Sequence, residues 1–391
     1  MKVKIAVSPR LRIPPIALVL LGLMGAAFIV AIVRYVYGIG AISNLSNAYP
    51  WGFWVSFDLY TGIAISSGAF VLTSLVYILE LEQFRPLIRP TLLTGFLGYG
   101  MEVVALLVDL GHPERIWHYF IYQNFHSFLL VIGLYVMIYA AIMLVEFAPT
   151  VLERLKLEKL SALIKRFMKP LVIVGAVIST LHQGSLGALL LIQPAKLYPL
   201  WWTPLLPVLF FISAISIGLA MTIFESSLSS RYFKRGLEIH LLEKLARGIP
   251  FVLGFYLVVR FVQLFLAGDM QYLFSGGLMS LLFWVEILVG AVLPIIVFSL
   301  RSVRRSPQGL LIASIILLLG MILNRFDVSW FSVRHPDPLT YVPAFMSSVH
   351  YTPSLPEMLI SAGIFSGGLL AFGLAVKYLP VFESAEKETE K

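Results

Sequence analysis

The chain of 391 residues is 59% hydrophobic and only 13% charged, and it contains no cysteine. A soluble domain carries about 25% charged residues, and a mean hydropathy of +0.89 leaves more apolar surface than a soluble core of this size can bury. The missing cysteine excludes disulfide bonds, thiolate-ligated zinc or iron–sulfur clusters and a thiol nucleophile within this polypeptide. The composition therefore predicts a polytopic membrane protein.

Ten apolar stretches are long enough to cross a bilayer, which takes about 20 residues. We expect them at residues 13–37, 54–79, 90–110, 127–147, 170–193, 205–225, 248–267, 277–300, 308–324 and 357–379. The ninth stretch is the shortest. Because only helices and closed barrels satisfy their backbone in lipid, and the alternation typical of barrels is absent, the predicted fold class is an all-α integral membrane bundle.

The basic residues are distributed unevenly between the two sides of this bundle. Of the 29 lysines and arginines, 23 fall in the two termini and the even-numbered loops. Four fall in the opposite loops, namely Arg115, Lys196, Arg325 and Arg334. Cytoplasmic loops carry the excess of Lys and Arg, so the net charge of +8 indicates an N-in, C-in topology in the cytoplasmic (inner) membrane rather than nucleic-acid binding. The expected organisation is a cytoplasmic N-terminus at 1–12, a transmembrane domain at 13–380 and a cytoplasmic tail at 381–391.

Several ionisable residues lie inside the predicted spans. Such a residue costs about 2.5–3.5 kcal/mol near the bilayer centre, so each is a candidate for function. At about 1.5 Å per residue, Asp58, Glu102, His182 and Glu225 step from the outer third of the membrane to its inner face. Glu102, His182, the adjoining Gln183 and Glu225 are therefore candidates for a proton path. Unrelated helix-packing contacts are the alternative interpretation.

Arg260 and Glu286 form a separate case. They lie on consecutive predicted spans at similar depths below the same surface. A structural ion pair that fixes helix packing is the simpler interpretation, and removing either partner would leave a buried charge without compensation.

The predicted outer loop at 110–127 contains three histidines, together with Trp117 and Asn124. A metal site is disfavoured, because the loop has neither an i, i+4 histidine pair nor an HExxH pattern. A structural loop at the level of the lipid headgroups is one alternative, since Trp and Tyr favour that position. The rim of a quinone site or a docking surface is the other, and it would involve His112, Trp117 and Asn124.

Haem is also disfavoured by the histidines. A b-type haem usually takes axial histidines from facing helices. Of the seven histidines, only His182 lies well inside a predicted span. We therefore expect no haem and no iron–sulfur cluster in this chain.

Short blocks of sequence are similar to those of a known family. They include Pro50-Trp51-Gly52-Phe53-Trp54-Val55-Ser56-Phe57-Asp58, Val108-Asp109-Leu110-Gly111, Thr180-Leu181-His182-Gln183-Gly184-Ser185 and Ile223-Phe224-Glu225-Ser226-Ser227. In order and spacing the chain resembles the NrfD/polysulfide-reductase membrane-subunit family over about residues 13–380. Within that family it is most similar to the b-type cytochrome membrane subunits of nickel–iron hydrogenases.

The resemblance implies a haem-free, quinone-reactive subunit of anaerobic respiratory electron transport, with exchangeable menaquinone or ubiquinone. Its implied partners are a periplasmic ferredoxin-like iron–sulfur subunit and nickel–iron hydrogenase catalytic subunits. Trp54 and Asp58 would lie at the quinone, with Glu102, His112, Trp117 and Asn124 as further candidates. One departure leaves the proton route open, because some relatives have a Glu where this chain has Val131.

Other functions remain open from the sequence alone. The alternative partner enzyme is a polysulfide, nitrite or tetrathionate reductase, or another molybdoenzyme or multihaem reductase. A ten-helix secondary transporter is a more remote alternative, because such transporters often have inverted repeats and paired helix breaks, and neither is visible here. A simple membrane anchor does not readily explain the buried carboxyls. The direction of electron flow and whether turnover moves charge are not determined.

Overall fold

The computed structural model describes residues 14–46, 49, 51–192, 197–234, 236–332 and 351–382. Within these ranges, ten helical segments are long and apolar enough to cross a membrane, and the fold is all-α. The predicted ten-span helical bundle is confirmed. The predicted terminal segment 1–12 and residues 383–391 of the predicted tail lie outside the described residues.

Six spans are single helices and four are composite. The single helices are α1 (Pro15–Tyr37), α6 (Phe128–Arg154), α8 (Met168–Leu191), α9 (Leu206–Phe233), α10 (Ile239–Ala267) and α17 (Leu355–Tyr378). The composite spans are η2 (Val55–Gly62) with α2 (Ile63–Ser66) and α3 (Gly68–Tyr77); η3 (Glu82–Leu87) with α4 (Ile88–Asp109); α11 (Leu278–Ile287) with η7 (Leu288–Val292) and α12 (Leu293–Ser299); and α14 (Pro307–Phe326) with η8 (Asp327–Phe331). Short helices in the connections are η1 (Ile39–Ala41), η4 (Pro113–Arg115), α5 (His118–Ile121), α7 (Glu158–Arg166), η6 (Asp269–Phe274) and α13 (Arg301–Arg304).

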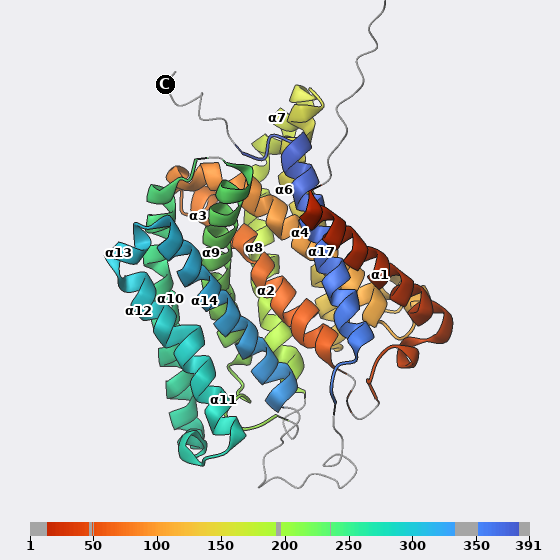
Figure 1. The fold of residues 1–391 in the computed structure, drawn as a ribbon, viewed down its shortest axis with the longest axis vertical. Helices are drawn as coiled ribbons and strands as arrows, with labels where there is room; N and C mark the ends of the chain where they lie inside the picture. The colour runs from red at the N-terminus through yellow and green to blue at the C-terminus, as the bar shows by residue number, and fades with distance from the viewer. Residues whose placement is uncertain are drawn as a thin grey trace, which may run out of the picture.

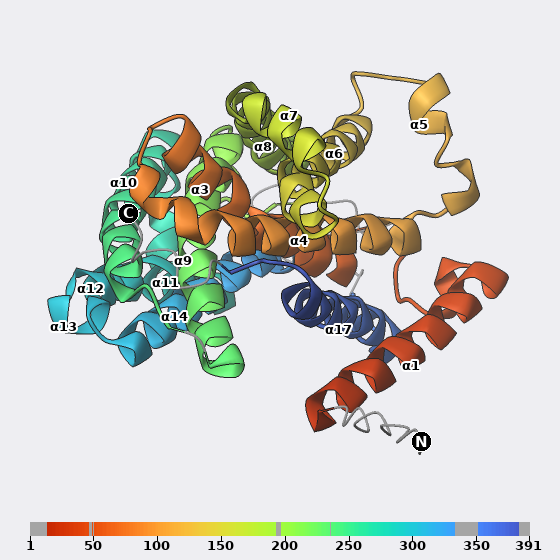
Figure 2. The same cartoon turned by 90° about the horizontal axis from the view of Figure 1, so that it is seen from above.

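Helix α9 lies at the centre of the bundle. It packs against α3 and α8 on one side and against α10 and α14 on the other, so it joins the two halves of the chain (Figure 1). Helices α1 and α17 pack together at the edge, as the view from above shows (Figure 2). The last span therefore returns to the first half of the chain.

Close helix contacts depend on pairs of glycines. A Cβ atom on Gly218 of α9 would lie 2.8 Å from the backbone nitrogen of Gly68 on α3. A Cβ atom on Gly320 of α14 would lie 2.3 Å from the Cα of Gly290 in η7. Small residues let helix backbones approach in membranes, and here they bring the second span against the sixth and the eighth against the ninth.

Three of the composite spans contain π-helical turns, at η2, η7 and η8. Such turns are rare and often occur at functional sites. The last of them corrects a sequence prediction. The ninth span continues to Phe331 instead of ending at residue 324, so Arg325 lies inside the bundle with 1% of its surface exposed and is not a loop residue. The helix continues after Arg325 through η8. Hydrogen bonds from the guanidinium to Asn324 and Ser213 offset the cost of burying its charge.

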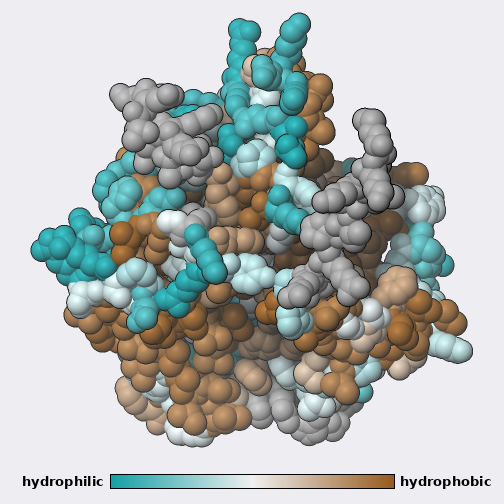
Figure 3. All heavy atoms as spheres, turned by 45° about the horizontal axis from the view of Figure 1, so that its top comes forward, coloured by the Kyte–Doolittle hydropathy of each residue, from teal (hydrophilic) through white to brown (hydrophobic). Residues whose placement is uncertain are grey.

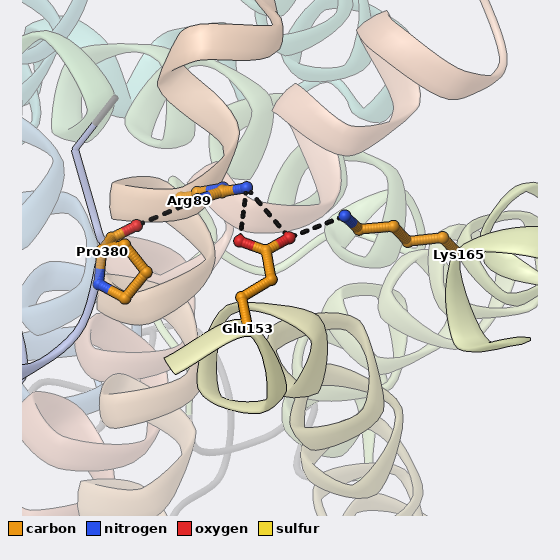
Figure 4. A network of polar contacts seen from close by, with 4 residues as sticks. All are labelled: Arg89, Glu153, Lys165 and Pro380. Carbon is orange, nitrogen blue, oxygen red and sulfur yellow. Dashed lines mark hydrogen bonds and ion pairs between the residues drawn. The ribbon is translucent and has the colours of Figure 1, made fainter. Parts of the chain in front are cut away.

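The surface of the molecule divides into an apolar band and a polar end. Hydrophilic residues gather at the end that carries α7, and hydrophobic residues cover the sides below it (Figure 3). At this polar end, Glu153 of α6 accepts a hydrogen bond from Lys165 at 2.6 Å and lies 3.0 Å from a guanidinium nitrogen of Arg89 (Figure 4). Arg89 also donates to the carbonyl of Pro380 at 3.1 Å. These contacts connect α4, α6, α7 and the segment after α17.

Candidate functional site

Two hydrogen bonds join η2 to α17 near the end of the bundle opposite α7. The hydroxyl of Ser361 donates to Oδ2 of Asp58 at 2.7 Å. The indole nitrogen of Trp54 donates to the carbonyl of Glu357 at 3.1 Å. Trp54 is buried and Asp58 is half-buried. Trp54 and Asp58 are four residues apart on one span, and Glu357 and Ser361 are four residues apart on the other, so the two hydrogen bonds connect successive helical turns. The Asp58 carboxyl is thereby held at a half-buried position.

The start of α17 is fixed by Glu357, which is fully buried. Its carboxylate accepts hydrogen bonds of 2.6 Å from the hydroxyl of Tyr351 and from the backbone nitrogen of Ser354. Ser354 and Glu357 form a capping box. The Tyr351 hydroxyl also accepts from the backbone nitrogen of Phe53 at 2.8 Å. Burial raises the pKa of Tyr351 above its ordinary value, so the hydroxyl remains a donor to Glu357.

Arg34 holds the end of α4 beside this site. A long charged side chain near the end of a span is able to extend to the membrane surface. The Arg34 side chain is buried instead. Its Nε donates to the carbonyl of Val108 at 2.7 Å, and a second nitrogen donates to the carbonyl of Leu110. A cation at a helix C-terminus satisfies free carbonyls and interacts favourably with the helix dipole. Arg34 also interacts electrostatically with Asp109, the last residue of α4.

Glu102 is a second carboxyl near Asp58. It is buried on α4, and its Oε2 lies 3.3 Å from the position that a Cβ atom on Gly62 would occupy. Among the residues that the structure describes, no donor reaches its Oε1. Asp58 and Glu102 interact electrostatically. The structure therefore places both predicted carboxyls beside η2, the first π-helical turn.

Two of the other predicted proton-path residues meet the second span after η2. Gln183 donates to the carbonyl of Ile63 at 3.3 Å. Glu225 lines a narrow crevice with Ile65, Ser66, Gly68 and Ala69, among others. His182 is fully buried, and its Nδ1 lies 3.1 Å from the hydroxyl of Tyr99 on α4 instead.

The predicted loop residues lie away from this group. His112, Trp117 and Asn124 are exposed. Their described polar contacts are local. His112 pairs with Glu114 at 2.9 Å, and the side-chain oxygen Oδ1 of Asn124 accepts from the backbone nitrogen of residue 126 at 3.1 Å. The short helix α5 in this loop extends away from the bundle (Figure 2). Within the described ranges, no group of three or more His, Asp or Glu side chains is arranged to hold a metal ion.

Arg260 and Glu286 are both buried in the second half of the chain. They interact electrostatically, yet each makes its hydrogen bonds elsewhere. Arg260 donates to the carbonyl of Leu200 at 2.6 Å. Glu286 accepts from the indole of Trp201 at 2.6 Å and from the amide of Asn324 at 2.7 Å. Among the described ion pairs none joins the two predicted partners within 4.0 Å, and neutral donors surround the carboxylate instead.

The histidines within the described ranges do not fit a haem held between two of them. His182 is the one buried histidine in the described part of the chain, and its ring is packed against Tyr99 and Tyr135 at 5.7 and 6.2 Å. The other histidines there are exposed or half-buried, namely His112, His118, His126 and His240. No reaction step is assigned to haem.

The site also includes residues that sequence reasoning missed. Ser361 and Glu357 are polar residues near the start of the tenth span, and the pattern Ser354-x-x-Glu357 before an apolar run is a recognisable capping signal. Tyr99 and Ser361 carry no local pattern that points to their partners. Their roles follow from contacts across 83 and 303 residues of sequence.

Ten membrane-spanning helices with carboxyls beside a buried π-helical turn define a polytopic subunit of the inner membrane. Residues 41–329 match the family model described as polysulphide reductase, NrfD, and the chain belongs to this NrfD family. A protein of Nitratidesulfovibrio vulgaris is 38% identical over 81% of this chain and 84% of its own length. The probable Ni/Fe-hydrogenase 2 b-type cytochrome subunit of Escherichia coli is 29% identical over 89% and 87%. The menaquinone reductase integral membrane subunit of N. vulgaris is 28% identical over 88% and 86%.

Proposed function

We propose that this chain is the quinone-reactive membrane subunit of a respiratory oxidoreductase. It passes electrons between an iron–sulfur subunit on the outer face of the membrane and a quinone dissolved in the bilayer. The observation that carries the proposal is the half-buried Asp58 carboxyl, held by Ser361 and accompanied by buried Glu102. The relatives named as a menaquinone reductase subunit and a hydrogenase subunit support it.

The chemistry of quinone reduction explains why carboxyls are needed at such a position. Reduction of a quinone to a quinol adds two electrons and two protons, and each carbonyl oxygen becomes a hydroxyl. The electrons come from the partner's clusters, and the protons have to come from groups beside the quinone. In this proposal Asp58 donates a proton to a quinone oxygen and Glu102 supplies the next one. The aromatic side chains of Phe53, Phe57 and Phe326, whose ring centres lie 5.3 to 6.2 Å apart, provide an apolar wall.

We place the quinone end on the outer face, in keeping with the N-in, C-in distribution of basic residues. The exposed loop with His112, Trp117 and Asn124 then belongs to the surface on which the iron–sulfur subunit docks. Glu225, Gln183 and His182 remain candidates for a route from the inner side. If protons follow this route, turnover moves charge across the membrane, and if they come from the outer side it does not.

A nickel–iron hydrogenase is the partner that we favour, because the E. coli relative is named as a hydrogenase subunit. Other relatives are named as a selenate reductase subunit and a polysulfide reductase chain. Purification of the native complex through a tag on this chain, followed by mass spectrometry of the copurifying subunits, tests this choice. Recovery of a hydrogenase large subunit supports it, and recovery of a molybdenum-containing reductase in its place rejects it.

Substitution of Asp58 by Asn in the native complex tests the role of the quinone site. We expect the quinone-linked rate to fall at least about 100-fold, the usual loss when a proton-transferring group is removed. Electron transfer from the partner to a soluble dye should not change. Glu158→Gln, on the exposed helix α7 at the opposite end of the bundle, is the control variant that keeps both rates. An unchanged quinone-linked rate in Asp58→Asn would refute the proposal.

A further inference from the structure

A second polar cluster lies inside the other half of the chain, where α9, α10, α11 and the junction of α14 with η8 meet. Asp327, the first residue of η8, is fully buried there. Among the described residues, no hydrogen-bond donor reaches either of its carboxyl oxygens. Its polar neighbour is the carboxyl of Glu286, which faces it across the α11–η8 contact. Neither carboxyl belongs to the quinone site.

Two ionised carboxyls in contact repel each other and offer only acceptors. The oxygens of Glu286 already accept hydrogen bonds from Trp201 and Asn324, so this group is equipped to carry negative charge. Asp327 has no such donors. A single proton between the two carboxyls gives Asp327 a hydrogen bond to Glu286 and removes the repulsion.

The nearby arginines do not neutralise the pair by direct contact. The guanidinium of Arg325 lies 3.9 Å from the ring centre of Phe210 and donates to Ser213 at 2.7 Å and to Asn324 at 2.8 Å. Arg260 donates to the carbonyl of Leu200 and lies over the ring of residue 283. Within the described part of the chain, no arginine or lysine nitrogen lies within 4.0 Å of either carboxyl.

The remaining titratable groups that face the cluster are tyrosines. Tyr256 of α10 accepts a hydrogen bond from the Asn324 amide at 3.3 Å. Tyr60 of η2 is fully buried and interacts electrostatically with Arg325. Both are neutral phenols at physiological pH, so they are available to donate or accept hydrogen bonds without adding a charge.

A small cavity adjoins the cluster. It is lined by Tyr256, Arg260, Asn324 and Arg325, and its volume of about 10 Å³ is close to the room that one water molecule requires. The Nε atoms of both arginines have no acceptor among the described residues, although both side chains are 1% exposed. One water accepting from the two Nε groups would satisfy these donors and hydrate the cluster next to Asn324.

We propose that Asp327 and Glu286 form a proton-binding site, in which one proton is shared between the two carboxyls inside the second half of the bundle. The donors Trp201 and Asn324 stabilise the negative charge on Glu286, and Asp327 carries the proton. Neither carboxyl has a described interaction with Asp58 or Glu102, so the pair is a proton store separate from the quinone site. It does not depend on the identity of the quinone or of the partner enzyme.

Infrared spectroscopy of the purified complex in light and heavy water tests this assignment. A protonated carboxyl has a carbonyl stretch that shifts on deuteration, and an ionised one does not. We expect the intensity of one such group per chain to disappear in Asp327→Asn and also in Glu286→Gln, because either new amide donates to the remaining carboxyl and lets it ionise. Asp327→Glu should keep a shifted band.

The matched control is Glu158→Gln, which alters an exposed and therefore ionised carboxyl on α7. It should leave unchanged the band that the other two variants remove. The two isosteric variants are independent, so one that assembles normally is sufficient for the test. If an assembled variant keeps the complete protonated-carboxyl band of the native protein, the carboxyl that it lacks does not contribute to this band, and the proposal is wrong.

Discussion

The hydroxyl of Ser361 donates to the carboxyl of Asp58 at 2.7 Å across 303 residues of sequence. This contact joins the second span to the last one. Ser361 is the side chain that donates to the half-buried Asp58 carboxyl among the described residues. Together with the hydrogen bond from Trp54 to the Glu357 carbonyl, this contact fixes the position of the Asp58 carboxyl relative to α17.

Replacing Ser361 by Ala should slow quinone-linked turnover by about three- to tenfold. The variant removes one hydrogen bond, worth about 0.5–1.5 kcal/mol, and each 1.36 kcal/mol corresponds to a factor of ten in rate. Steady-state assays of the native complex with a quinone and with a soluble dye measure the effect. Ser366→Ala on the same helix is the control, because the Ser366 hydroxyl donates only to its own helix at Ala362. Equal rates for the two variants would contradict a role of Ser361 at the site.

Replacing Tyr351 by Phe should destabilise the protein by about 1–3 kcal/mol. The hydroxyl donates to Glu357 and accepts from the backbone nitrogen of Phe53, and a buried group left without its partner costs about that much. Thermal unfolding in detergent measures the change. Tyr378→Phe is the control, since Tyr378 is 56% exposed. A midpoint equal to that of the control would show that the contact contributes little.

The same tyrosine predicts a pH dependence of stability at the alkaline end. Burial raises the pKa of Tyr351 in the folded state above its ordinary value. The unfolded chain therefore loses this proton first, and stability falls as the pH rises above about 10. Unfolding midpoints measured across this range should decline less steeply in Tyr351→Phe than in the native protein. Parallel curves would argue against the raised pKa.

Replacing Gly320 by Ala should destabilise the second half of the bundle by about 1–3 kcal/mol, the usual cost of overpacking. The new Cβ atom would lie 2.3 Å from the Cα of Gly290, so the helices have to separate. Gly254→Ala is the matched control on α10, where no atom lies within 4 Å of the new Cβ. That variant should keep or slightly raise the unfolding midpoint, because alanine is the better helix former. A stable Gly320→Ala protein would show that this contact is adaptable.

Replacing Glu153 by Gln should have a small effect, below about 1 kcal/mol, and one that decreases at high salt. Glu153 pairs with Arg89 and Lys165 at the polar end of the bundle, where all three side chains are partly exposed. Ion pairs in such positions contribute little and are screened by salt. Unfolding midpoints at low and high ionic strength measure this, with Glu158→Gln as the control. A large effect that does not depend on salt would indicate a structural role for the network in Figure 4.

Part of the candidate site was predictable because lipid restricts where charge is found. Asp58, Glu102, His182 and Glu225 are conspicuous in apolar stretches, and hydropathy alone identifies such residues as costly. The structure groups Asp58 and Glu102 around η2, and it brings Gln183 to the carbonyl that follows this turn. For the exposed loop residues His112, Trp117 and Asn124, a quinone rim or a docking surface stays a prediction. Residue type alone does not tell whether a loop folds back over a site.

The second half of the chain shows where sequence reasoning was insufficient. A similar depth predicted a direct pair between Arg260 and Glu286, but depth does not determine the direction in which a side chain points. Glu286 turns to Trp201 and Asn324, and Arg260 turns to a backbone carbonyl. The predicted ninth span ends at residue 324, so Arg325 and Asp327 are expected outside it. Contacts with Ser213 and Phe210 of α9 allow the burial of Arg325, and these partners come from a helix that is distant in sequence.

The sequence by itself determined the class of this protein and its family, the number of its spans and the carboxyls placed within them. The class, the number of spans and the unusual position of the carboxyls follow from the free-energy cost of placing polar groups in lipid, which depends on the local sequence alone. Only the tertiary structure decided which charges have partners. Hydrogen bonds such as the one from Ser361 to Asp58 join helices that are distant in sequence, and their existence depends on packing around α9 and not on any local pattern.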